Sequence, residues 1–76
     1  MKYEIKSETK ERLENTFKYH TPKEDQLDRY DCIRAYAFEL ALTICSCTPP
    51  SREQSLALTK LEEAVMHANA AIARNE

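Results

Sequence analysis

The sequence predicts an all-α protein, folded as an antiparallel helical hairpin and assembled into a homo-oligomer. Three observations support this fold class. The 76 residues include no glycine, which the tight turns of β-hairpins commonly need. Charged residues make up 32% of the chain, and most of them are good helix formers. Two long stretches also repeat apolar residues in steps of three and four, which is the spacing of one helical face.

The N-terminal part of the chain is polar and of mixed charge. Residues 1–15 fit either a frayed tail or a short helix, and we treat them as a segment separate from a hairpin domain at residues 16–76. Residues 16–20, TFKYH, alternate aromatic with polar side chains. We expect these five residues to form a short ordered lead-in to the first long helix.

The first long helix is predicted at about residues 22–46. Thr21, Pro22 and Glu24 fit an N-cap, a first helical position and a third helical position, the pattern of a capping box. The apolar side chains that follow lie on one predicted face. They are Leu27, Tyr30, Ile33, Ala37, Leu40, Ala41 and Ile44.

The second long helix is predicted at about residues 51–75. The sequence TPP ends the first helix, because a residue before proline avoids helical geometry. Ser51 then fits the N-cap, with Gln54 at the third helical position. The predicted core face of this helix consists of Leu58, Leu61, Val65, Ala68 and Ile72. The connection between the two helices is short, which favours antiparallel packing.

Two helices cannot enclose a hydrophobic core, and each one has a second, partly apolar flank. Phe38 and Leu42 form this flank on the first helix, and Leu56 and Met66 form it on the second. Because so short a chain is marginally stable alone, we expect other protomers to cover these flanks. The alternative is that Phe17 and residues 1–15 fold back over them.

Composition limits the classes of function. The net charge of −2 disfavours a duplex-DNA binder but leaves room for a small anionic ligand. The chain has three cysteines, Cys32, Cys45 and Cys47, which cannot all pair with one another. We expect them to fill small apolar gaps between helices. A zinc site would need ligands from remote parts of the chain, so we expect neither a metal nor a cofactor. With no apolar run at the N-terminus or elsewhere, a cytosolic protein is expected.

No catalytic constellation is visible, but the start of the second helix has an unusual pattern. Arg52, Ser55 and Thr59 follow the cap residue Ser51 at spacings that place all three on one helical face. A helix N-terminus favours anions, and a guanidinium group fits phosphate oxygens. We call Ser51, Arg52, Ser55 and Thr59 the phosphate rail. The alternative is an exposed polar face with an ordinary cap.

A second group combines aromatic and basic side chains. They are Phe17, Lys18, Tyr19 and His20 in the lead-in, and Arg29 and Arg34 on the first helix. An exposed tyrosine beside cations can stack on a nucleobase while the cations hold phosphates. Alternatively, Tyr19 is part of a hydrophobic lid over the start of the helix. The histidines, His20 and His67, fit surface or capping roles.

Two long segments resemble a known family. They are FKYHTPKEDQLDRYDCIRAYAFELA and PPSREQSLALTKLEEAVMHANAAIARNE, and they resemble the phage anti-CBASS sponges and the hairpin domain shared with the anti-Thoeris sponges. The resemblance covers about residues 15–76. It implies a small helical homohexamer that sequesters cyclic nucleotides without cleaving them, and so it implies a binding protein and not an enzyme.

The resemblance also implies roles for single residues. Tyr19 would stack on a base of a cyclic dinucleotide such as cyclic GMP–AMP, between paired protomers. Arg34 stands at the position of a phosphate-contacting lysine. Arg52, with Ser55 or Thr59, would face the phosphates of a cyclic trinucleotide such as cyclic tri-adenylate, where three protomers meet. His67 departs from the family pattern, in which tryptophan is common.

The leading hypothesis is therefore a bacteriophage immune-evasion protein that acts in the cytoplasm of the infected bacterial host. It would block CBASS signalling by binding cyclic di- and trinucleotides. The alternative is a small helical protein-interaction module that inhibits a host protein, which needs only the amphipathic faces of the helices.

Overall fold

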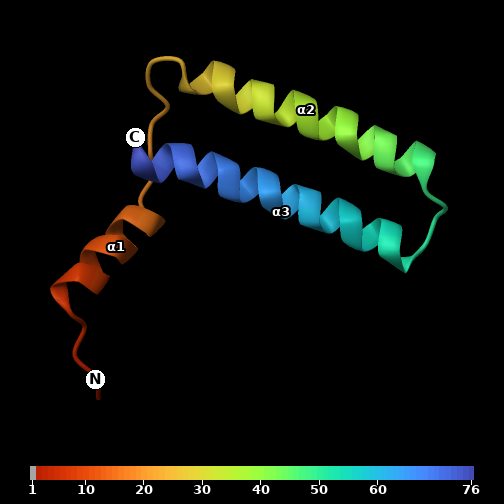
Figure 1. The fold of residues 1–76 in the computed structure, drawn as a ribbon. Coiled ribbons are helices and arrows are strands. Elements are labelled where there is room, and N and C mark those ends of the chain that lie inside the picture. Colours follow the sequence, from red (N-terminus) through yellow and green to blue (C-terminus); the bar gives the residue numbers. More distant parts are fainter. Residues whose placement is uncertain (1) are drawn as a thin grey trace.

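The computed structural model describes residues 2–76, and this range contains three helices and no strand (Figure 1). Helix α1 spans Ser7–Phe17, α2 spans Gln26–Cys47 and α3 spans Arg52–Asn75. The predicted all-α class is therefore confirmed. α2 and α3 form an antiparallel hairpin, and α1 projects from the end of the hairpin at which α3 finishes. Residue 1 of the predicted N-terminal segment lies outside the described range.

The seam between α2 and α3 follows the predicted apolar faces closely. Ten of the twelve predicted residues are half-buried along this seam: Tyr30, Ile33, Ala37, Ala41, Ile44, Leu58, Leu61, Val65, Ala68 and Ile72. The prediction is wrong for Leu27 and Leu40, which are 61% and 49% exposed. A single neighbouring helix covers only a narrow stripe of α2, and these two side chains lie outside it.

The hairpin has no closed hydrophobic core of its own. The Cα atoms extend only 13 Å in the thinnest direction, which is close to a single layer of helices. None of the apolar side chains in residues 2–76 is fully buried, and the predicted flank residues Phe38, Leu42, Leu56 and Met66 are 42–64% exposed. Exposed apolar area on this scale favours burial against another molecule. Self-association therefore stays a prediction, and the exposed flanks support it.

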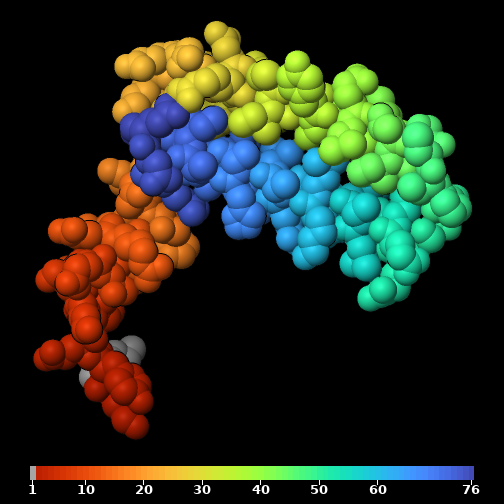
Figure 2. Space-filling model, in the orientation of Figure 1, coloured from red at the N-terminus to blue at the C-terminus, as the bar shows by residue number. Residues whose placement is uncertain are grey.

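The alternative in which the N-terminal segment folds back is wrong for the protomer. Residues 7–17 form a helix that stands apart from the hairpin in the space-filling view (Figure 2). Phe17, the residue predicted to cover the flanks, is 81% exposed at the end of α1. The flanks on α2 and α3 therefore remain open.

The start of α2 differs from the prediction by four residues. Glu24 has a φ of 52°, in the left-handed region, which a helix beginning at Pro22 cannot contain. The amide of Gln26 donates to the carbonyl of Lys23 at 3.0 Å, and the Gln26 side-chain oxygen accepts from the Lys23 amide at 3.1 Å. These bonds form a tight turn, so the predicted capping box at Thr21 is wrong. The turn leaves Lys18–Lys23 outside any helix, beside the end of α3.

The turn between α2 and α3 confirms the predicted cap. The amide of Gln54 donates to Ser51 Oγ at 3.1 Å, so Ser51 is the N-cap of α3. The Gln54 side chain does not complete a capping box with the Ser51 amide. It donates instead to the carbonyl and the hydroxyl of Thr48, both at 3.1 Å, and fixes the turn.

Candidate functional site

The predicted lead-in at residues 16–20 is shorter in the structure, because Thr16 and Phe17 belong to α1. The remaining lead-in, Lys18–His20, is held across the end of α3 by hydrogen bonds from the last turn of α1. The Asn15 side-chain amide donates to the carbonyl of Arg74 at 3.0 Å, and the carbonyl of Asn15 accepts from His20 Nε2 at 2.8 Å. His20 therefore caps the end of α1, which is one of the two roles predicted for it. Its Nε2 atom carries the proton, because a carbonyl oxygen can only accept. The two bonds position the lead-in between α1 and the hairpin.

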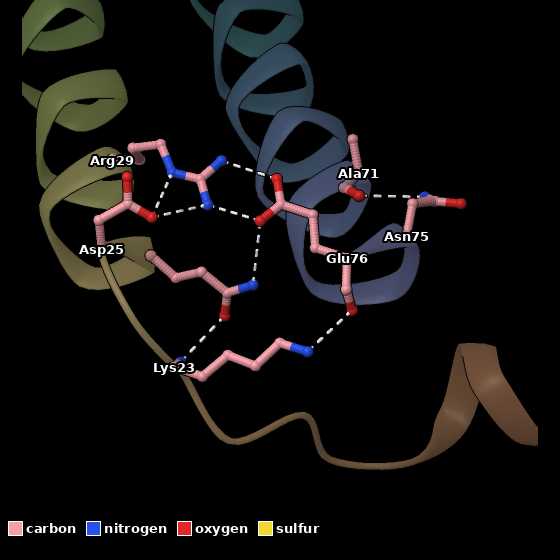
Figure 3. Close-up of polar contacts among 7 residues, drawn as sticks. Lys23, Asp25, Arg29, Ala71, Asn75 and Glu76 are labelled. Carbon is pink, nitrogen blue, oxygen red and sulfur yellow. Dashed lines mark hydrogen bonds and ion pairs between the residues drawn. The ribbon is translucent and has the colours of Figure 1, made fainter.

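A clamp of charged side chains joins the end of α3 to the start of α2 (Figure 3). The Arg29 guanidinium donates to both carboxylate oxygens of Glu76, at 2.7 and 2.5 Å, and to Asp25 at 3.2 Å. Gln26, only 4% exposed, donates to the same carboxylate at 3.2 Å, and Lys23 Nζ donates to the carbonyl of Glu76 at 3.2 Å. The clamp fixes the end of the hairpin at which the lead-in lies.

The clamp also perturbs the ionisation of its own groups. The hydrogen bonds from Arg29, and then from Gln26, lower the pKa of Glu76 to about 2. The bond with Glu76 in turn raises the pKa of Arg29 above its usual value. Both side chains therefore keep their charge at any pH near neutrality, and the Glu76 carboxylate is held by neighbouring donors.

An open hollow of about 310 Å³ lies where the lead-in, α2 and α3 meet. We call it the Tyr19 hollow. Its lining residues are Thr16, Lys18, Tyr19, His20, Tyr30, Arg34, Asn69, Ala70, Ala73 and Arg74. Three of these residues, Lys18, Arg34 and Arg74, are basic, and none of the ten is acidic. An open hollow with cations and aromatic rings suits a flat anionic ligand.

The lead-in separates this hollow from a smaller one of about 200 Å³. The smaller hollow is lined by Thr21, Lys23, Gln26 and Glu76, and it shares Lys18, Tyr19, His20 and Ala73 with the first. Its carboxylate is the one held by the clamp. Glu76 lines the smaller hollow together with Lys18 and Lys23, whereas the lining of the Tyr19 hollow contains basic residues and no acidic one.

The structure brings together four of the six residues of the predicted aromatic and basic group: Lys18, Tyr19, His20 and Arg34 line the Tyr19 hollow. Phe17 and Arg29 do not line it, because Phe17 lies exposed at the end of α1 and Arg29 belongs to the clamp. The Tyr19 ring is 81% exposed, so it is not a buried lid in the protomer. Arg34 is also largely exposed and lies 3.7 Å from Asp31, an exposed pair of small energetic value. Both side chains are therefore accessible to a ligand.

The phosphate rail lies at the opposite end of the hairpin. About 26 Å of helix separates Arg52 from Asn69, at 1.5 Å per residue. The Arg52 side chain is 80% exposed and 4.0 Å from Glu53, and Ser55 and Thr59 are exposed as well. Ser51 differs, because its hydroxyl accepts from Gln54 and donates to the carbonyl of Pro49 at 3.0 Å. Within one protomer, the hydroxyl of Ser51 is already engaged in the hydrogen bonds of the helix cap. The side chains of Arg52, Ser55 and Thr59 face solvent.

Metal-binding and membrane-spanning features receive no support in the part of the chain that is described. Cys32, Cys45 and Cys47 are exposed and unpaired, so the prediction that they fill apolar gaps is wrong for the protomer. No cluster of three or more potential metal ligands occurs among residues 2–76. None of the three helices has the length and hydropathy to span a membrane.

The geometry and the sequence agree with one known family. The sequence matches the family described as "Acb2/Tad1, hairpin domain" over residues 9–73. The chain belongs to this family. Neither a curated protein nor a solved structure matches the chain. The Acb2/Tad1 hairpin is a binding domain associated with sponging of cyclic nucleotides, and the match covers all of α2 and most of α1 and α3.

The hairpin also brings residues to the site that sequence reasoning missed. Tyr30, Asn69 and Arg74 line the Tyr19 hollow, and none of them was a predicted site residue. The antiparallel arrangement of an Acb2/Tad1 hairpin places the start of one helix beside the end of the other. The sequence therefore contained a signal that Asn69 and Arg74, in the last part of α3, lie at the same end of the hairpin as Arg34.

Proposed function

We propose that this chain is a bacteriophage immune-evasion protein that binds cyclic di- and trinucleotide messengers and holds them without cleaving them. By lowering the free messenger concentration in the cytoplasm of the infected bacterial host, it blocks CBASS signalling. The observation that carries the proposal is the convergence of Tyr19, Lys18 and Arg34 in one open hollow of an Acb2/Tad1 hairpin.

The Tyr19 hollow is the proposed dinucleotide site. A base of a cyclic dinucleotide such as cyclic GMP–AMP stacks on the exposed Tyr19 ring, and stacking of this kind is worth about 1–3 kcal/mol per base. Arg34 and Lys18 hold the phosphates, with the guanidinium fork offering two parallel hydrogen bonds. Two copies of the hollow, related by the symmetry of a protomer pair, would engage the two halves of the ring.

The phosphate rail is the proposed trinucleotide site. Arg52, Ser55 and Thr59 face solvent in the protomer and form no pocket by themselves. A three-fold axis within a homohexamer would bring three rails together around a ring such as cyclic tri-adenylate. Three guanidinium groups would repel one another when the site is empty and would be neutralised when three phosphates bind. Ser51 contributes through the helix cap, because its hydroxyl is already used.

Sequestration requires binding alone, and the residues of the Tyr19 hollow supply stacking, charge and hydrogen bonds. The one imidazole in this hollow is tied to the end of α1 through Nε2. The decisive experiment is recovery of the ligand. The protein is incubated with cyclic GMP–AMP or cyclic tri-adenylate and then digested with protease, and the released nucleotide is analysed by mass spectrometry. Intact cyclic nucleotide supports a sponge, whereas linear products would show an enzyme.

A second candidate is a protein-interaction module that inhibits a host protein. The exposed apolar side chains of α2 favour it, since Tyr36 and Phe38 are 75% and 62% exposed. This function needs no nucleotide site. Calorimetry against a panel of cyclic di- and trinucleotides separates the two candidates. A folded protein that gives no binding heat with any of them would support the interaction module.

A further inference from the structure

The side-chain oxygen of Asn69 has no hydrogen-bond partner in the described part of the chain. This Oδ1 atom is buried and accepts no hydrogen bond from residues 2–76. Buried polar atoms in native proteins are nearly always paired, because an unpaired one loses its contact with water and gains nothing in return. An unpaired amide oxygen at a hollow therefore suggests a partner that the protomer itself does not supply.

The surroundings of Asn69 show where such a partner could lie. Asn69 lines the Tyr19 hollow together with Tyr19 and Arg34, and the other α3 residues of the lining are Ala70, Ala73 and Arg74. Alanine side chains leave space for a flat ring to approach the helix. The partner would therefore share the hollow with the ligand phosphates and with the base that stacks on Tyr19.

An asparagine amide combines one acceptor with two donors. No protein hydrogen bond in the described chain holds the buried Oδ1 in place, so rotation about the side-chain bonds can present both the oxygen and the nitrogen to the hollow. The Hoogsteen edge of adenine presents a donor at N6 and an acceptor at N7, and asparagine pairs with both at once. Guanine presents two acceptors on the same edge, O6 and N7, and cannot pair in this way.

We propose that Asn69 is a base-reading residue of the Tyr19 hollow and gives it a preference for adenine. The amide oxygen accepts from adenine N6, and the amide nitrogen donates to N7 of the base that stacks on Tyr19. The inference rests on the proposed dinucleotide site and extends it, because Tyr19 and the cations bind any base and any phosphate, while the Asn69 amide distinguishes the two purines.

The test uses the full chain and measures affinities by calorimetry for cyclic di-AMP and cyclic di-GMP. We expect the wild type to bind cyclic di-AMP roughly tenfold more tightly, within the discrimination that one bidentate pair provides. Asn69→Leu is close in size and favours a helix at least as well, so the fold should persist. This variant should bind the two ligands equally, with its affinity for cyclic di-GMP little changed. Asn75→Leu, an asparagine of the same helix outside the hollow, should keep the wild-type preference.

A ligand analogue tests the same contact without any mutation. Cyclic di-AMP built from 7-deazaadenine lacks the N7 acceptor and should bind the wild type several-fold more weakly than cyclic di-AMP, since one of two hydrogen bonds is lost. Asn69→Leu should bind both ligands alike. If the variant does not fold, the wild-type comparison still decides the question.

The failures can be told apart. A wild type that binds neither dinucleotide would overturn the proposed dinucleotide site and this inference together. A wild type that binds both ligands equally, or is indifferent to 7-deazaadenine, would overturn the role of Asn69 alone. A reduced particle mass of Asn69→Leu by light scattering would show that the amide pairs with a second protomer, and this result would also overturn base reading.

Discussion

Phe38 provides a direct test of whether the open face of α2 is an interface between protomers. Its side chain is 62% exposed in the protomer. A phenylalanine buries about 200 Å² when fully covered, so roughly 120 Å² remains available for an interface. At about 25 cal/mol per Å², covering this area contributes about 3 kcal/mol per protomer. Phe38→Ser removes most of this contribution while changing little inside the protomer.

We therefore expect Phe38→Ser to raise the concentration at which the assembly dissociates by roughly 100-fold, since 1.4 kcal/mol corresponds to a factor of ten. Serine and phenylalanine have similar helix propensities, so α2 should form in both proteins. Light scattering coupled to size exclusion over a dilution series measures the effect. Glu39→Ser, which alters the adjacent charged residue of α2, is the matched control and should assemble with nearly wild-type affinity.

Two outcomes would refute this reasoning. A wild type that is monomeric at every concentration would show that the exposed apolar side chains serve another partner. A Phe38→Ser variant with the wild-type mass at every dilution would show that assembly uses a different face. The first outcome would also remove the physical basis of the sites that depend on paired or three-fold protomers, whereas the second would refute only the role of the Phe38 face.

The remaining predictions concern the two sites and the ends of α3. Tyr19→Ala should weaken cyclic dinucleotide binding roughly 10- to 100-fold in calorimetry and leave trinucleotide binding intact, and Arg52→Ala should do the converse; equal losses for both ligands would contradict two separate sites. Ser51→Ala should lower the unfolding free energy by about 1 kcal/mol in urea titrations, and an unchanged midpoint would show that the cap is dispensable. Because the folded-state pKa of Glu76 is lowered from 4.5 to about 2, the stability that it contributes is present above about pH 4.5 and is lost as the pH falls towards 2. Glu76→Gln should therefore lose stability at pH 7 and show a weaker acid dependence between pH 4.5 and 2, and an acid dependence equal to that of the wild type would show that the bond with Arg29 has no thermodynamic effect.

The sequence determined the helical hairpin because its signals are local. The spacing of Ile33, Ala37 and Ala41 fits only a helical face, and these residues are half-buried at the seam. Ser51 determined the start of α3 because an N-cap needs only its own hydroxyl and an amide three residues later. The long family match is also a property of the sequence alone, and it directed attention to Tyr19 and Arg34.

Only the tertiary structure decided where α2 begins and what gathers beside it. The local pattern at Thr21 predicted a cap, but contacts with the distant end of α3 favour a turn with Glu24 in the left-handed region and Gln26 bonded to Glu76. This turn leaves the lead-in outside any helix and lets Tyr19 meet Asn69, some fifty residues later in the chain, at one hollow. Such contacts depend on the packing of segments far apart in the sequence, and no local spacing encodes them.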